Sequence, residues 1–112
     1  MLVYRIILAK YADKLIASGR AARWNPNDVE MIYTASSRSL ACLENVVHRS
    51  GKGLTQRIGE KWISENNTAV LQVPSSIVSE EVNYLLNPKH KDFGEIKIFN
   101  RQPFVFDSRI KA

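Results

Sequence analysis

The sequence has few of the residues on which metal centres, disulfide frameworks and membrane spans depend. Cys42 is the only cysteine among 112 residues, so no internal disulfide can form. The two histidines, His48 and His90, belong to no HxxxH or CxxC pattern, and we therefore expect no metal site. No apolar run approaches the length of a membrane span, and the N-terminus lacks the long apolar core of a signal peptide. We expect a soluble cytoplasmic protein with no membrane partner.

The sequence also lacks any concentrated block of positive charge. Its net charge of +5 is spread from Arg5 to Lys111, with no basic run longer than a pair. Such an excess fits a polyanionic partner, which could be nucleic acid, an acidic protein or a phosphate-bearing ligand. The absence of a basic tail weakens the nucleic-acid option.

The bulk composition is that of one ordinary globular domain. Hydrophobic residues make up 45% of the chain and charged residues 24%. We therefore expect a single domain over residues 1–112. A core of this size gives modest stability, so a permanent partner or a homodimer would be physically useful.

Hydrophobic patterning and turn residues predict an α+β domain with a mostly antiparallel sheet. Helices are expected from a cap at Ser36 or Ser37 to about His48, and from a Thr55 cap to about Glu65. A short helical turn is expected within 10–22, a turn at 75–82 and compact irregular structure at 83–88. Strands are expected at 2–8, 31–35, 69–73, 95–99 and 102–106.

The expected helices each have an apolar face. In the first, Leu40, Leu43, Val46 and Val47 gather on one side, and Glu44 lies on the flank of that stripe. In the second, Ile58, Trp62 and Ile63 are expected to face inward. Cys42 is interpreted as a small buried hydrophobe, and it would lie on a different helix face from His48.

Five side chains carry the groups needed to handle a dinucleotide at its glycosidic bond: Arg23, Asn25, Tyr33, Glu44 and Ser75. An arginine matches a pyrophosphate in charge and geometry, and an aromatic ring can stack on nicotinamide. A carboxylate can hold a ribose hydroxyl and stabilise the positive charge that develops as the bond breaks. Each residue also has an ordinary structural alternative: a surface ion pair, a core aromatic, a solvated glutamate or a turn-forming serine.

Several motifs together resemble the RES-domain family, which is named for its arginine, glutamate and serine. The front half carries Arg23-Trp24-Asn25, Ile32-Tyr33-Thr34-Ala35 and Leu40-Ala41-Cys42-Leu43-Glu44. The back half carries Val73-Pro74-Ser75-Ser76-Ile77-Val78 and Asn83-Tyr84-Leu85-Leu86-Asn87-Pro88-Lys89-His90. Residues 59–62 and 104–109 also look like the family, so the resemblance covers nearly the whole chain in order.

The resemblance implies an ADP-ribosyltransferase-like fold: a twisted, mostly antiparallel split β-core with flanking short helices. It implies a toxin of a type II toxin–antitoxin system that consumes NAD as a substrate. Family members cleave the nicotinamide N-glycosidic bond by hydrolysis or phosphorolysis, or transfer ADP-ribose to a protein. They are neutralised by an Xre-type helix-turn-helix antitoxin, and a homodimer within that complex is expected.

The resemblance also implies a role for each candidate residue. Arg23, beside Asn25, would grip the phosphates, and Tyr33 would line the nicotinamide pocket. Glu44 would orient the nicotinamide ribose and stabilise the oxocarbenium-like transition state. Ser75 would complete the polar contacts, and the adjacent Ser76 is the alternative family serine.

Two departures from the family pattern are visible. Ala21 and Ala22 stand where family members usually carry glycines, which would permit a closer backbone approach. Residues 49–53 also form a short bridge where RES domains typically have a longer segment. An alternative function is therefore a catalytically inactive RES-fold module that only binds the antitoxin. A small basic nucleic-acid-binding protein is a third reading.

Overall fold

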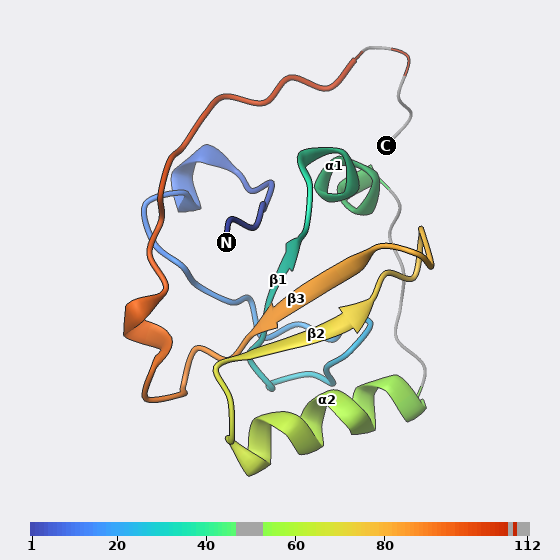
Figure 1. The fold of residues 1–112 in the computed structure, drawn as a ribbon, viewed down its shortest axis with the longest axis vertical. Helices are drawn as coiled ribbons and strands as arrows, with labels where there is room; N and C mark the ends of the chain where they lie inside the picture. The colour runs from blue at the N-terminus through green and yellow to red at the C-terminus, as the bar shows by residue number, and fades with distance from the viewer. Residues whose placement is uncertain (47–52, 108, 110–112) are drawn as a thin grey trace.

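The computed structural model describes residues 1–46, 53–107 and 109. Two helices flank a three-stranded sheet, and the turn-rich segment before β1 lies between the sheet and α2 (Figure 1). The structure is therefore α+β with an antiparallel sheet, as the sequence predicts. The elements are η1 (Ala9–Tyr11), β1 (Ile32–Ala35), α1 (Arg38–Val46), α2 (Gly53–Glu65), β2 (Val70–Pro74), β3 (Val82–Leu86) and η2 (Phe93–Glu95).

The sheet has the order β1-β3-β2, and both neighbouring pairs are antiparallel. The central strand is β3, in which Tyr84 pairs with Thr34 on one side and Gln72 on the other. The prediction of irregular structure at 83–88 was wrong here. The strand alternates buried Asn83 and Leu85 with half-buried Val82 and Tyr84. Because its first buried position is polar, the period-2 pattern is hidden in the sequence.

Two hydrophobic clusters attach the helices to the sheet. Trp62 of α2 packs with Met31, Val73 and Leu85. Leu40 of α1 packs with Ala35 and Ala41, and Tyr4, Ile6 and Val78 cover this second cluster. Each helix therefore has its own packing contact with the sheet, which fixes the side chains that it carries.

The start of α1 confirms one predicted cap, and the start of α2 corrects another. The Leu40 amide donates to Ser37 Oγ at 3.1 Å, the bond expected of an N-cap serine. The second helix begins at Gly53, so Thr55 is not its cap. The Thr55 hydroxyl instead donates to the Arg23 carbonyl at 2.7 Å. A contact distant in sequence therefore accounts for this threonine.

The predicted inner faces of the helices are correct only in part. Leu40 and Trp62 are buried and Ile63 is half-buried. Leu43 and Ile58 were wrongly assigned inward, since they are 45% and 46% exposed. Besides Trp62, the buried position on α2 is Gly59, where the backbone of another segment takes the space of a side chain. The side chain of Val46, together with Val47 and His48, falls outside what the structure describes.

The prediction of strands at 2–8, 95–99 and 102–106 was wrong, since the structure describes these residues and they form no strand. From 2–8, only Tyr4 pairs, through two backbone hydrogen bonds of 2.9 Å with Ala35. Residues 95–99 and 102–106 form no strand; η2 ends at Glu95, and the following stretch runs along the outside of the N-terminal segment (Figure 1). Their apolar residues are largely exposed, so alternation here does not reflect a buried sheet face. Within the described ranges, no helix is long and apolar enough to span a membrane.

Candidate functional site around Glu44

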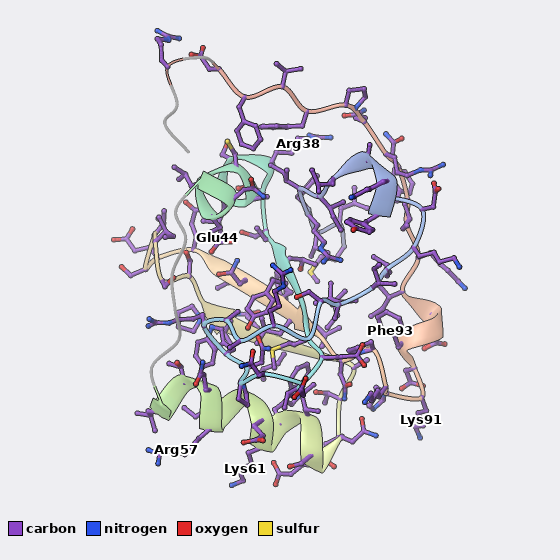
Figure 2. The ribbon with its side chains drawn as sticks, turned by 180° about the vertical axis from the view of Figure 1, so that it is seen from behind. Arg38, Glu44, Arg57, Lys61, Lys91 and Phe93 are labelled. Carbon is purple, nitrogen blue, oxygen red and sulfur yellow. The ribbon has the colours of Figure 1, made fainter. Side chains whose placement is uncertain are left out.

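The site centres on the Glu44 carboxylate, which α1 directs toward one end of the sheet (Figure 2). Asn83 Nδ2 donates to Glu44 Oε1 at 2.6 Å, and Ser75 Oγ donates to Glu44 Oε2 at 3.2 Å. Asn83 belongs to β3 and Ser75 directly follows β2. Three elements that are distant in sequence therefore fix one carboxylate from both of its oxygens.

Ser75 has no hydrogen-bonding capacity left for a ligand. Its Oγ accepts the backbone N–H groups of Ile77 and Val78, both at 3.1 Å, while its proton points at Glu44. A hydroxyl offers one donor and two acceptor lone pairs, and all three are in use. The side chain is also buried, at 4% exposure. In this structure Ser75 is the serine that contacts Glu44, and it orients that carboxylate.

Asn83 is the neighbour of Glu44 that the sequence does not reveal. Its Nδ2 donates to the Thr34 carbonyl at 3.1 Å as well as to Glu44, so both amide protons are used. The side chain is buried in the sheet interior, at 7% exposure. A buried polar side chain on a central strand normally serves a specific partner. That partner is Glu44, 39 positions away in the chain.

The environment of Glu44 raises its pKa above the ordinary value of 4.5. Partial burial is the main cause, because removing water disfavours the charged form. The hydrogen bonds from Asn83 and Ser75 oppose this effect, and repulsion from Glu81 adds to it. Glu44 therefore ionises at a higher pH than a free glutamate, and its ionised form has two donors already in place.

Beside Glu44 lies a cleft of about 180 Å³. Glu44, Tyr33 and Arg5 are among the residues that line it. Arg5 is a second residue that sequence reasoning missed; it donates to the Ile16 carbonyl at 3.0 Å, and burial lowers its pKa. The cleft is lined by Tyr4, Arg5, Ile6, Tyr33, Thr34, Ala35, Ala41, Glu44 and Asn45.

The Tyr33 hydroxyl anchors the turn that precedes β1. It donates to Asn25 Oδ1 and accepts the Trp24 backbone N–H at 3.0 Å. Burial raises the pKa of Tyr33 to about 12, against the opposing effect of the Trp24 hydrogen bond. The phenol is thus neutral at physiological pH, and its hydroxyl is directed into the turn.

Asn25 and Arg23 lie on the turn itself and are not among the residues that line the cleft. Asn25 is 2% exposed, and its Nδ2 donates to carbonyls of its own loop, including Arg20 at 2.8 Å and Val29 at 3.0 Å. Arg23 is half-buried, and its Nε has no hydrogen-bond partner in the part of the chain that the structure describes. Tyr33 and Glu44 thus share the cleft. Ser75 contacts Glu44 and Asn25 contacts Tyr33 from outside it, whereas the Arg23 side chain hydrogen-bonds to neither cleft residue within the described ranges.

Other parts of the described structure offer fewer functional groups in one place. Among the described residues, no three of the His, Cys, Asp and Glu side chains lie where they could hold a metal ion. Cys42 is a free, half-buried thiol. A larger hollow of about 480 Å³ shares no residue with the Glu44 cleft and is lined by Asp13, Ile98, Phe99, Asn100 and Arg101.

The sequence matches a family model described as the RES domain, over residues 2–53 and 50–107. The chain belongs to the RES-domain family. This RES domain is 32% identical to a protein of Sphingobium sp. named "Prs ADP-ribosylating toxin", in an alignment covering 88% of each chain. It is 31% identical to a "Toxin Res" of Yersinia enterocolitica, covering 99% of this chain and 100% of the relative.

A "Toxin Res" of Pseudomonas putida is 35% identical over 98% of this chain and 99% of the relative. The three alignments span 141, 153 and 147 positions, each longer than the 112 residues of this chain. The two ranges matched to the family model meet at residues 50–53. The relatives therefore contain internal residues that this RES domain lacks.

Proposed function

We propose that this RES domain is a toxin that consumes NAD by breaking the bond between nicotinamide and ribose. The observation that carries the proposal is the Glu44 carboxylate, held by Asn83 and Ser75 at the edge of a small cleft. The names of the relatives from Sphingobium and Yersinia, an ADP-ribosylating toxin and a toxin, support this class of function. ADP-ribosylation uses NAD, so the same bond would break.

In the proposed reaction, the bonding electrons leave with the nicotinamide nitrogen and positive charge develops on the ribose. The ionised Glu44 stabilises that charge and holds a ribose hydroxyl, a task comparable to that of the carboxylates in glycosidases. An oxygen of water or phosphate, or a protein side chain, then bonds to the ribose carbon. The three acceptors correspond to a glycohydrolase, a phosphorylase and an ADP-ribosyltransferase.

The cleft suits one end of the dinucleotide. Its volume of about 180 Å³ is smaller than the roughly 300–1,000 Å³ typical of complete ligand pockets. We place the nicotinamide riboside end there, against the Tyr33 ring. The phosphates then extend toward two positively charged residues. Arg5 lines the cleft, and Arg23 lies on the neighbouring turn. Ser75 and Asn25 support this arrangement through Glu44 and Tyr33 and do not touch the ligand.

The family also suggests a setting for this activity. We propose that the sheet is the core of an ADP-ribosyltransferase-like fold, and that residues 49–53 replace a longer segment in an otherwise single RES domain. The charge of +5 fits both NAD phosphates and an acidic surface on an Xre-type antitoxin. A homodimer within a cytoplasmic toxin–antitoxin complex completes the proposal. No direct nucleic-acid contact is part of it.

A second candidate is a catalytically inactive RES domain that only binds the antitoxin. The internal residues missing relative to the relatives favour this alternative, because an active site can depend on such a segment. The contacts of Ser75 and Asn83 with Glu44 favour the enzyme. The two candidates differ in whether the purified protein turns over NAD.

The test is release of nicotinamide from NAD by the purified chain in three conditions: with water alone, with inorganic phosphate, and with a bacterial lysate as a source of protein acceptors. We expect release by the wild type and its loss in Glu44→Gln, which keeps the shape and removes the charge. Glu60→Gln, an exposed glutamate of α2, is the matched control and should retain wild-type turnover. Equal turnover by Glu44→Gln would refute the catalytic role. No turnover by the wild type, together with antitoxin binding, would establish the second candidate.

A further inference from the structure

We propose that α2 is a positioning element of the cleft. Thr55, Gln56 and Gly59 hold three successive carbonyls of the turn at 22–24, and through this turn they set the position of Tyr33. The inference rests on the proposed function for its catalytic consequence, although its structural part can be tested separately. These three helix residues are called the α2 clamp below.

Each contact of the α2 clamp takes a different carbonyl. Gln56 Nε2 donates to the Ala22 carbonyl at 3.1 Å, and Thr55 Oγ1 donates to the Arg23 carbonyl at 2.7 Å. The Trp24 carbonyl packs directly on Gly59, where an added Cβ would stand 1.7 Å from its oxygen. Backbone carbonyls of an irregular segment have no sheet or helix partner, so the hydrogen bonds from Gln56 and Thr55 supply one for Ala22 and Arg23.

The clamp residues share one side of the helix. Thr55 and Gly59 are four positions apart, and residues with that spacing lie one above the other on a helix face. Trp62, one turn further, is buried in the core cluster with Met31 and Leu85. Arg57 and Lys61 are exposed and project from the solvent side (Figure 2). The core therefore fixes α2, and α2 fixes the turn.

The turn transmits this position to the cleft through the phenol. The Trp24 backbone N–H donates to the Tyr33 hydroxyl, which in turn donates to Asn25 Oδ1. The Ala22 N–H donates to the Asn25 carbonyl at 2.9 Å and closes the turn on itself. Tyr33 and Glu44 both line the cleft. A displacement of the turn would therefore move one wall of the cleft while leaving the Asn83 and Ser75 contacts to Glu44 intact.

The structural part is tested by hydrogen exchange of the Trp24 backbone amide. We expect exchange to be roughly tenfold faster in Thr55→Val, which keeps the shape of threonine without its donor, and slow again in Thr55→Ser. Gly59→Ala should act like Thr55→Val. Gly53→Ala is the matched control on the same helix, because an added Cβ there meets nothing within 4 Å. Unchanged exchange at Trp24, or an equal acceleration of the β3 amides, would overturn the clamp as a positioning element.

The catalytic part is tested by nicotinamide release at varied NAD concentration. We expect KM for NAD to rise several-fold in Thr55→Val and Gly59→Ala, with a smaller change in kcat and an unchanged pH profile, because Glu44 keeps its own partners. Wild-type kinetics in variants with accelerated Trp24 exchange would refute the link from turn to cleft. If the wild-type chain released no nicotinamide with water, phosphate or a lysate as the source of acceptors, the proposed function would fail, while the exchange result would still decide the structural part.

Discussion

In the Asn83→Asp variant, the activity of the proposed reaction should fall at high pH, where the wild-type activity levels off. The substitution keeps the shape of the side chain but replaces the amide that donates to Glu44 Oε1 at 2.6 Å with a second carboxyl group. Two carboxylates this close cannot both ionise easily, so they share a proton until the pH is well above the ordinary range. With one proton present, the introduced carboxyl group can still donate to Glu44 as the amide of Asn83 does. Once that proton leaves, the donor is lost and repulsion takes its place.

The size of the effect follows from the distance. Two unit charges 2.6 Å apart repel by about 6 kcal/mol at an effective dielectric constant of about 20. Glu44 is only partly buried, so solvent screening reduces this value. Half of this repulsion energy still corresponds to a pKa shift of about two units. Because the pKa of Glu44 is already raised, the shared proton should leave well above the pH at which a free glutamate ionises.

The assay is kcat/KM for nicotinamide release, measured from about pH 5 to about pH 9 in wild type and variant. Wild-type activity should rise as Glu44 ionises and then level off. The Asn83→Asp activity should fall at the alkaline end, by roughly tenfold relative to wild type. Asn67→Asp, at an exposed position, is the control and should follow the wild-type profile. Parallel profiles for Asn83→Asp and wild type would refute the assignment of Asn83 as the residue that orients Glu44.

Two further predictions use other neighbours of the cleft. Glu81→Gln removes a charge that raises the pKa of Glu44, so the acid limb of the same pH profile should move to lower pH; an unmoved limb would show that Glu81 does not act on the reacting carboxylate. Tyr33→Phe leaves Asn25 Oδ1 and the Trp24 N–H without their phenol partner, and thermal unfolding should show a loss of about 1–3 kcal/mol. An unchanged melting temperature for Tyr33→Phe would contradict the anchoring role of the hydroxyl.

Local sequence signals predicted the parts of the fold that depend on local chemistry. Ser37 caps α1 as expected, because a serine before an apolar helix pattern carries the needed acceptor in itself. The strand around Ile32 and the flanking position of Glu44 also follow from periodicity over a few residues. The strand at 83–86 escaped prediction because the partner that makes a buried Asn83 acceptable lies 39 residues away.

The missed site residues share the same physical reason. Arg5 contributes to the cleft only because the N-terminal segment bridges to Ala35, a contact that no local pattern encodes. Thr55 looked like a helix cap because its hydroxyl suits that role, but a carbonyl 32 positions away takes its proton. Gly59 lies in a stretch that resembles the family, but its contact with the Trp24 carbonyl could not be predicted, because its role is to leave space for that carbonyl. Predicting the roles of such residues requires knowing which segments are in contact in the folded chain.

The arrangement around Glu44 has a consequence during synthesis. The carboxylate is translated 31 residues before Ser75 and 39 residues before Asn83, and both are needed to hold it. A nascent chain that has not yet exposed β3 has neither the central strand of its sheet nor the donors for Glu44. Any activity that depends on the oriented carboxylate therefore begins only after most of the chain has left the ribosome. On the proposed function, a nascent chain would therefore have no NAD-consuming activity until β3 has been made.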